Sequence, residues 1–250
     1  MLLSQDHGAV RVLTLDRPEK KNAFNLELTD ALWMSLEAAS ADPSVRVVVL
    51  TGSGDIFSAG ADLNVFLEAA TPKEGRDITR VGRLFEPLRA CTKPTIAAVQ
   101  GPAVGMGVTL LPHFDLVYAA ESATFLTPFV KLGLVVEYGG SYWLERVIGA
   151  SRAKELLLRA KPIDARTACD WGLVTRLFPR ERLMDEVMAI AKDIADAPPG
   201  AVAETRRLME HGRTHTLEEA FAEEGRTLAT RYGSAENVEA VMAFLAARKK

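Results

Sequence analysis

One acidic residue lies in an otherwise apolar stretch of this chain, and its surroundings suit proton transfer. Glu137 stands in "GLVVEYGGSYWL" (133–144), among valine, tyrosine, tryptophan and glycine. Burial in such surroundings disfavours the ionised carboxylate and raises its proton affinity, as a general base working near neutral pH requires. The alternative is a solvated loop residue that pairs with Lys131 or Arg146. The residues by themselves leave both interpretations open.

Two glycine-bearing segments could supply the other half of such a site. Each follows an apolar run typical of a buried strand: "FSAGADL" (57–63) comes after 45–52, and "GPAVGMGVTLL" (101–111) comes after 95–100. Small residues let a ligand approach the main chain closely, and the start of a helix presents unpaired N–H groups. Two such donors directed at one oxygen form an oxyanion hole. Turns needed only for close packing would show the same glycines.

Other chemical motifs are incomplete. A dinucleotide fingerprint that begins at Gly105 needs a glycine where Leu110 stands, and a nucleophile elbow in "GGSYW" needs one at Trp143. His211 and His215 have the spacing of H-E-x-x-H but lack the acid between them. We therefore expect no metal site and no redox cofactor.

Composition narrows the possible partners and the compartment. The 250 residues carry a formal net charge of -3 and no basic stripe, so nucleic acid is not expected as a partner. Apolar runs stay below the roughly 18 residues that a membrane span needs. Cys91 and Cys169 lie far apart in the sequence and fit a reducing compartment. We expect a cytoplasmic protein that does not enter a membrane.

The elements that position these residues alternate between strands and helices and then become helical. Apolar runs predict strands at 9–15, 45–52, 95–101, 114–120 and 176–179. Helical spacing predicts helices over 26–40, around 62–70 and 76–91, and through most of the chain from 141 onward. This order predicts an α/β core over residues 1–195 and a C-terminal helical region over 196–250.

Several stretches, in one order from about residue 9 to 180, resemble the crotonase (enoyl-CoA hydratase/isomerase) superfamily. They are "RPEKKNAF", "VRVVVLTGSGDIFSAGADL", "KPTIAAVQGPAVGMGVTLL", "FDLVYAAESATF" and "KPIDARTACDWGLVTRLFP". The resemblance implies a crotonase (ClpP-like) spiral of ββα units with a C-terminal helical trimerisation region. It also implies an acyl-CoA thioester ligand, with CoA as part of the substrate, and a homotrimer or a dimer of trimers.

The same resemblance implies where the thioester would bind. Its oxygen would accept hydrogen bonds from the main-chain N–H groups of Ala59 and Met106. Asp62 is expected to hold its loop rather than to take part in chemistry. The residues expected around the substrate are Lys21, Ala23, Ala59, Gly60, Ala61, Asp62, Leu63, Gly105, Phe129 and Tyr138.

The pattern of acids separates this chain from the hydratases that it resembles. Those enzymes carry two glutamates, at the positions of Thr109 and Phe129, so efficient water addition is not expected here. The context of Glu137 resembles the peroxisomal-type Δ3,Δ2-enoyl-CoA isomerases of lipid metabolism, in which one glutamate transfers the proton. Two alternatives stay open. One is a ring-type isomerase of phenylacetate breakdown, and the other is a non-catalytic acyl-CoA-binding homologue.

Overall fold

The computed structural model describes residues 1–64 and 85–248, and the chain divides into two compact units, Met1–Ala191 and Lys192–Lys250. The division falls inside helix α8 (Leu183–Asp196), whereas the sequence placed it after residue 195. Most of the two helices predicted between 62 and 91 lies outside the described residues. The described end of that stretch forms α3 (Phe85–Ala90).

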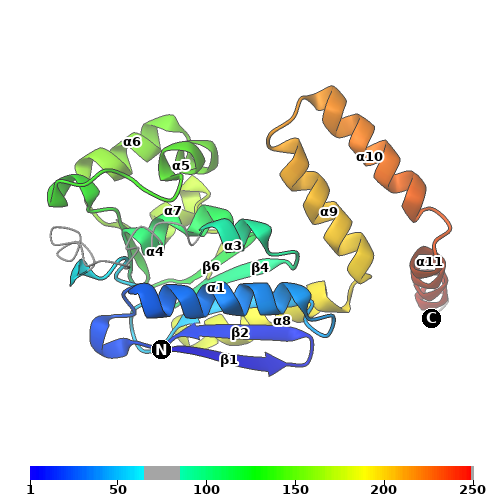
Figure 1. Cartoon of the computed structure of the whole chain (residues 1–250), viewed down its shortest axis with the longest axis horizontal. Coiled ribbons are helices and arrows are strands. Elements are labelled where there is room, and N and C mark those ends of the chain that lie inside the picture. Colours follow the sequence, from blue (N-terminus) through cyan, green and yellow to red (C-terminus); the bar gives the residue numbers. More distant parts are fainter. Residues whose placement is uncertain (65–84, 249–250) are drawn as a thin grey trace, which may run out of the picture. The chain divides into compact units, whose positions relative to one another are not determined.

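A six-stranded mixed sheet forms the centre of the first unit (Figure 1). Its order is β1 (Leu2–His7), β2 (Val10–Leu15), β3 (Val47–Gly52), β4 (Thr95–Val99), β6 (Leu116–Ala120) and β9 (Arg176–Phe178). β1 and β2 pair antiparallel, and each later strand pairs parallel to its neighbour. All five strands predicted from apolar runs are confirmed. Within this sheet the sequence missed β1, because its side chains are mostly exposed and show no apolar pattern.

A second, three-stranded sheet is made of short pieces that sequence patterns do not reveal. β5 (Ala103–Val104) pairs parallel with β7 (Thr124–Leu126), which pairs antiparallel with β8 (Ile163–Asp164). Strands of two or three residues are too short to show an alternation of polar and apolar residues. This sheet matters for function because it fixes the start of the glycine-bearing segment at 101–111. The Gly105 N–H, directly after β5, donates to the Leu126 carbonyl at 2.7 Å.

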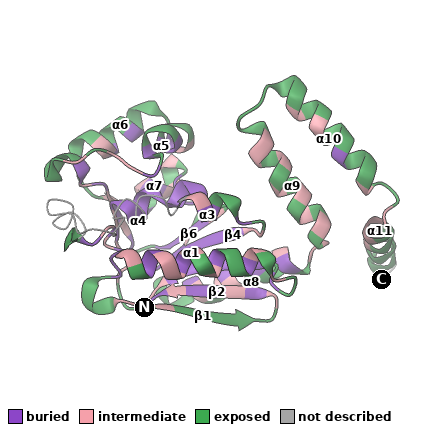
Figure 2. Ribbon diagram, viewed as in Figure 1, coloured by how far each residue is buried: buried purple, intermediate pink, exposed green. Residues whose placement is uncertain are grey.

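Helices surround both sheets of the first unit. The predicted helix at 26–40 is α1 (Leu26–Ala41), which packs on β1, β2 and α3 and is capped by the Asn25 side chain. The other helices and turns of this unit are η1 (Pro18–Lys20), α4 (Met106–Thr109), η3 (Leu111–His113), η4 (Phe129–Leu132), α5 (Gly140–Ile148), α6 (Ala150–Arg159), α7 (Ala165–Trp171) and η5 (Arg180–Arg182). Figure 2 shows the buried residues concentrated on the strands and on the sides of the helices that face them.

The second unit is helical, as the sequence predicts. It contains α9 (Pro199–Gly212), α10 (Leu217–Arg231) and α11 (Ala235–Ala247), and α10 begins with a capping box between Thr216 and Glu219. Arg207 of α9 donates to Glu223 and to Thr227 of α10, each at 2.7 Å. Neither α9 nor α11 buries a residue within the chain. Among the helices described, none has the length and hydropathy needed to cross a membrane.

Candidate active site

The segment 57–63 lies between two other predicted site segments. On one side, the Phe24 N–H donates to the Gly60 carbonyl and the Asp62 N–H donates to the Phe24 carbonyl, both at 2.8 Å. On the other side, the Val104 N–H donates to the Ser58 carbonyl at 2.9 Å. The three predicted segments, at 21–23, 57–63 and 101–111, are therefore neighbours in space.

Two residues that the sequence analysis did not assign hold these segments together. Arg17 donates to the Ala23 carbonyl at 2.6 Å and pairs with the Asp62 carboxylate at 3.2 Å. Asn22, fully buried and at φ 54°, donates through its amide to the carbonyls of Ser53 and Ile56. Asparagine tolerates this left-handed conformation better than most residues. The residue type was therefore the signal by which sequence analysis could have found Asn22. Asp62 thus holds its loop in this structure, as expected.

The geometry does not fit the prediction that the Ala59 N–H binds the thioester oxygen. This N–H donates to the Lys21 carbonyl at 2.9 Å, so it is already engaged within the protein. The bond ties the loop at 21–23 to the segment at 57–63. Ala59 is therefore corrected from an oxyanion donor to a structural contact of the candidate site.

The Ala61 N–H is the better candidate for the first donor. Gly60 and Asp62 make the main-chain bonds to Phe24, so the N–H of Ala61, between them, points to the opposite side. Met106 lies close to this segment, because a Cβ added to Gly60 would lie 3.2 Å from the Met106 nitrogen. Within residues 1–64 and 85–248, neither the Ala61 N–H nor the Met106 N–H bonds to a protein acceptor. Among the described residues, both donors are therefore free, and the glycine before Ala61 lies beside Met106.

A glycine directly precedes each of the two donor residues, and the backbone there requires it. Gly60 has φ +85°, and a Cβ there would lie 2.6 Å from the Val104 carbonyl oxygen. Gly105 has φ 54° and ψ −116°, a conformation that side chains disfavour. The Phe129 ring, almost fully buried, lies in van der Waals reach of the position that a Gly105 Cβ would take. Phe129 thus forms an apolar wall beside the Met106 N–H.

Glu137 is partly buried and held by a hydrogen bond rather than by an ion pair. The Thr109 hydroxyl donates to Glu137 Oε1 at 3.1 Å. Burial raises the pKa of Glu137 to about 7, although the Thr109 hydrogen bond acts in the opposite direction. The surface alternative is not supported, because Arg146 instead bonds the Tyr142 carbonyl and stacks on its ring. No ion pair to Glu137 occurs among the residues that the structure describes.

The residue after Glu137 is held just as firmly. Tyr138 is buried and has φ 54°, which is uncommon for a residue with a large side chain. Its carbonyl lies 2.8 Å from His113 Nε2, and because a carbonyl can only accept, Nε2 carries the proton. The His113 ring in turn meets the Trp143 ring edge-on. The main chain at Glu137–Tyr138 therefore has a fixed position against η3.

The remaining predicted substrate contacts differ in exposure. Ala23 and Asp62 are buried, whereas Lys21 is exposed and the Leu63 side chain is 61% exposed. The structure therefore places two predicted contacts where solvent and ligand can reach them. It places Ala23 and Asp62 below the surface, where they support the main chain.

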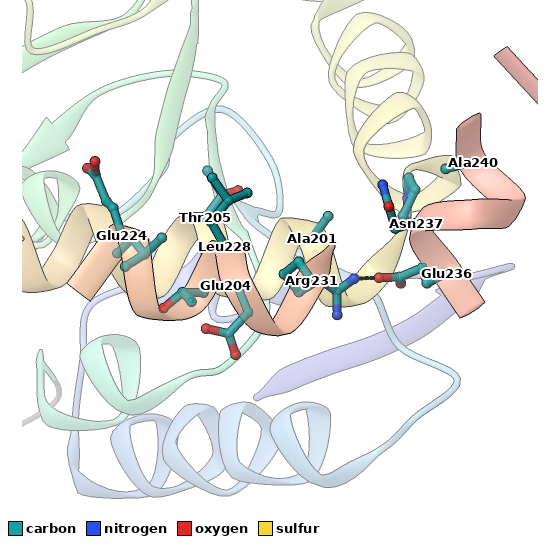
Figure 3. Close-up of a pocket in the computed structure, with 12 residues that line it drawn as sticks. Ala201, Glu204, Thr205, Glu224, Leu228, Arg231, Glu236, Asn237 and Ala240 are labelled. Carbon is teal, nitrogen blue, oxygen red and sulfur yellow. Dashed lines mark ion pairs between the residues drawn. The ribbon is translucent and has the colours of Figure 1, made fainter. Parts of the chain in front are cut away.

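The second unit has a hollow of its own, with a volume of about 360 Å³ (Figure 3). Side chains of α9, α10 and α11 line it, and an Arg231–Glu236 ion pair closes one side. It contains none of the predicted site residues. Across the described chain, no three His, Cys, Asp or Glu side chains gather as a metal site requires, and His211 and His215 stack on each other.

Comparison with known proteins gives the family. Residues 5–250 match the model of the enoyl-CoA hydratase/isomerase family. The chain belongs to this family. It is 35% identical to enoyl-CoA delta isomerase 2 of Rattus norvegicus over the whole of this chain, which spans 64% of that relative's length. It is 36% identical to 1,2-epoxyphenylacetyl-CoA isomerase of Escherichia coli, covering 99% of this chain and 96% of the relative.

Solved structures confirm the crotonase fold. The enoyl-CoA hydratase of Bacillus anthracis superposes with a TM-score of 0.91 at 30% identity, over 97% of this chain and 95% of the other. Relatives named as isomerases and as hydratases therefore share this architecture.

Proposed function

We propose that the protein is an enoyl-CoA isomerase that moves a double bond from C3 to C2 of an acyl-CoA thioester. The observation that carries the proposal is Glu137, a partly buried carboxylate with a pKa of about 7 near two main-chain donors that have no acceptor among the described residues. A pKa near neutrality lets one group take a proton and return it at comparable rates.

The proposed reaction conserves protons and electrons. The Glu137 carboxylate takes a proton from C2 of the 3-enoyl thioester, and the electron pair of that bond delocalises into a dienolate. The protonated Glu137 then delivers the proton to C4 while the double bond forms between C2 and C3. The carboxylate is regenerated, and neither metal nor redox chemistry is required.

The dienolate places negative charge on the thioester oxygen, where hydrogen-bond donors are needed. We assign this task to the N–H groups of Ala61 and Met106, which lie on facing segments and have no acceptor in the described chain. Donors aimed at developing charge in a site shielded from water stabilise the transition state strongly. Because both are main-chain groups held by glycine-dependent packing, they need no rearrangement during the reaction.

CoA is proposed to bind along the loop at 21–23 and the segment at 59–63, since Lys21 and Leu63 are exposed there. The acyl chain would then meet the apolar side chains of Phe129 and Tyr138. This placement directs the thioester oxygen toward Ala61 and Met106 and the reacting carbons toward Glu137.

Efficient hydration is not part of the proposal. Water addition needs groups that position and activate a water molecule and protonate carbon. At the two positions where the family resemblance implies the acids of a hydratase, this chain has Thr109, whose hydroxyl is bound to Glu137, and Phe129, which cannot titrate. One carboxylate is enough for the proton transfer of isomerisation but not for both tasks of hydration.

A ring isomerase is the second candidate function. The relative from Escherichia coli named 1,2-epoxyphenylacetyl-CoA isomerase is as similar to this chain as the delta isomerases are, and it matches nearly its full length. A single acid and an oxyanion hole would also serve that chemistry. Binding without catalysis is the third candidate, in which Glu137 would only contact the ligand.

The decisive experiment compares the wild type with Glu137→Gln. 3-Hexenoyl-CoA is the first substrate, with formation of the conjugated 2-enoyl thioester followed by absorbance. Glutamine keeps the shape and removes the base, so the rate should fall by at least about 10²–10⁴-fold while affinity for a CoA product is retained. Glu137→Gln activity within tenfold of the wild type would contradict the proposal.

Three substrates assayed side by side separate the candidate functions. Turnover of 3-hexenoyl-CoA supports the isomerase, and turnover of the phenylacetyl-CoA epoxide alone supports the ring isomerase. Binding of both thioesters without turnover of either supports the non-catalytic homologue. Rapid formation of 3-hydroxybutyryl-CoA from crotonyl-CoA would show that the acids have been assigned wrongly.

A further inference from the structure

The short segment that supplies the Met106 donor also contacts the base, Glu137, and the residue that follows it. Thr109, at the end of α4, donates its hydroxyl to Glu137 Oε1 at 3.1 Å. His113, at the end of η3, donates from Nε2 to the carbonyl of Tyr138, the next residue along, at 2.8 Å. One contact holds the carboxylate and the other holds the main chain that carries it.

The hydroxyl and the methyl group of Thr109 each make a contact within the protein. Its hydroxyl binds Glu137, and its methyl group faces Gly140, where an added Cβ would lie 3.0 Å from Thr109 Cγ2. Thr109 is fully buried, so its side chain is not a solvated group that happens to touch the acid. Gly140 begins α5, which packs against η3 and brings the Glu137 loop onto this segment.

We propose that α4 and η3 form one rigid frame in which Thr109 and His113 are positioning residues that set the distance between the base, Glu137, and the oxyanion donor on Met106. This inference rests on the proposed function, since it assigns the task of these two residues in the same site. It gives a task to the polar threonine at this fully buried position.

Charged neighbours do not account for the state of Glu137. The titratable groups on the elements around it are His113 on η3, Tyr138 in the same loop, Lys131 on η4, and Tyr142, Glu145 and Arg146 on α5. None of these contributes to the shift of its pKa, for which burial and the Thr109 hydroxyl are the causes. Thr109 is therefore the one described group whose removal should change the pKa of Glu137 without adding or removing a charge.

Thr109→Val and Thr109→Ser form a matched pair that separates the hydroxyl from the methyl group. Thr109→Val keeps the methyl contact with Gly140 and loses the donor that favours the ionised carboxylate. The midpoint of its pH–rate profile should therefore move upward by about one pH unit, because a hydrogen bond to the charged form lowers a carboxyl pKa. Its rate above that midpoint should also fall about tenfold or more from lost alignment. Thr109→Ser keeps the hydroxyl and should restore the wild-type midpoint.

His113 is tested by His113→Gln, which can still donate to the Tyr138 carbonyl, and by His113→Leu, which cannot. His113→Leu should lower kcat with little change in KM, and His113→Gln should recover part of the loss. A Thr109→Val enzyme with the wild-type midpoint and rate would overturn the proposal. So would Thr109→Ser behaving like Thr109→Val.

A readout without turnover keeps this test independent of the proposed function. The difference in unfolding free energy between each Thr109 variant and the same variant carrying Glu137→Gln reports the pKa of Glu137 through its pH dependence. An upward shift of that pKa in Thr109→Val supports the hydrogen bond even when no isomerase activity is found. An unchanged pKa overturns it even when Glu137→Gln abolishes activity.

Discussion

At the scale of single residues, Glu137 combines a catalytic requirement with a cost to the folded protein. Burial holds its pKa at about 7. Only the ionised carboxylate can take the C2 proton, so the isomerisation rate of the wild type should rise with pH and reach half its maximum near pH 7. The measurement is kcat for 3-hexenoyl-CoA across the neutral range. A profile that is flat down to pH 5 would mean that Glu137 titrates like an exposed glutamate.

The same residue should make stability depend on pH. The folded-state pKa of about 7 lies above the ordinary glutamate pKa of 4.5, so the protonated form is favoured in the folded protein. The stability that this group contributes is complete below about pH 4.5 and is lost as pH rises through 7. Glu137→Gln should therefore be more stable than the wild type above pH 7, by up to about 3 kcal/mol, and no more stable at pH 4. Urea unfolding at the two pH values measures the difference, and equal effects at both would contradict it.

The sequence pointed to Glu137, which the structure shows partly buried, and to the Ala59 N–H, which the structure shows already bonded to the Lys21 carbonyl. An acid between Val136 and Tyr138 is visible as an anomaly in the chain itself, and the structure shows it partly buried. The donor is different in kind, because glycine and alanine in "FSAGADL" do not reveal which N–H is already used. That depends on the pairing with Lys21 and Phe24, which are distant in the sequence. The Thr109 contact was equally hidden, since a buried threonine in an apolar run gives no signal of its partner.

At the scale of elements, the close approach of segments 57–63 and 101–106 is what creates the oxyanion site. Gly60→Ala should disrupt it, because the new Cβ would lie 2.6 Å from the Val104 carbonyl oxygen. Activity should fall at least about tenfold through displacement of Ala61 from Met106. Gly8→Ala, in the β1–β2 turn, is the matched control, since φ there is also positive and no atom lies within 4 Å of the added Cβ.

The control separates backbone strain from the clash. Gly8→Ala should cost about 1–2 kcal/mol of stability from the left-handed conformation alone and leave activity unchanged. Gly60→Ala should cost more and lose activity at temperatures where it is still folded. Circular dichroism melts and the isomerase assay on both variants decide this. Equal stability and full activity in Gly60→Ala would show that the two segments can separate freely.

Strands and helices were predicted correctly where burial leaves a pattern of apolar residues in the sequence. β3 and β4 are buried along nearly their whole length and appear in the sequence as continuous apolar runs. α1 has Leu28, Leu32 and Leu36 on one buried face at helical spacing. β5, β7 and β8 left no such pattern, because pairing with distant strands rather than local preference defines them. Yet these short strands fix Gly105 and hence the site.

At the scale of the whole molecule, the second unit exposes more apolar surface than an isolated chain should. Neither α9 nor α11 buries a residue. The exposed large apolar side chains of this unit are Met209, Leu217, Phe221, Leu228, Tyr232, Val238, Val241, Met242, Phe244 and Leu245. Exposed apolar side chains in this number are typical of a protein interface. We expect these helices to pack against other copies of the chain in a homotrimer or a dimer of trimers.

Charged substitutions on this surface should break the assembly. Phe244 is 62% exposed on α11, and Phe244→Glu would place a carboxylate in the proposed interface, where burying an unpaired charge is costly. Sedimentation velocity at micromolar concentration should show a trimer or hexamer for the wild type and a smaller species for Phe244→Glu. Met34→Glu, at a residue 66% exposed on α1, is the control and should leave the mass unchanged. A monomeric wild type would contradict the prediction, because the apolar side chains of α9–α11 would then face water in the native protein.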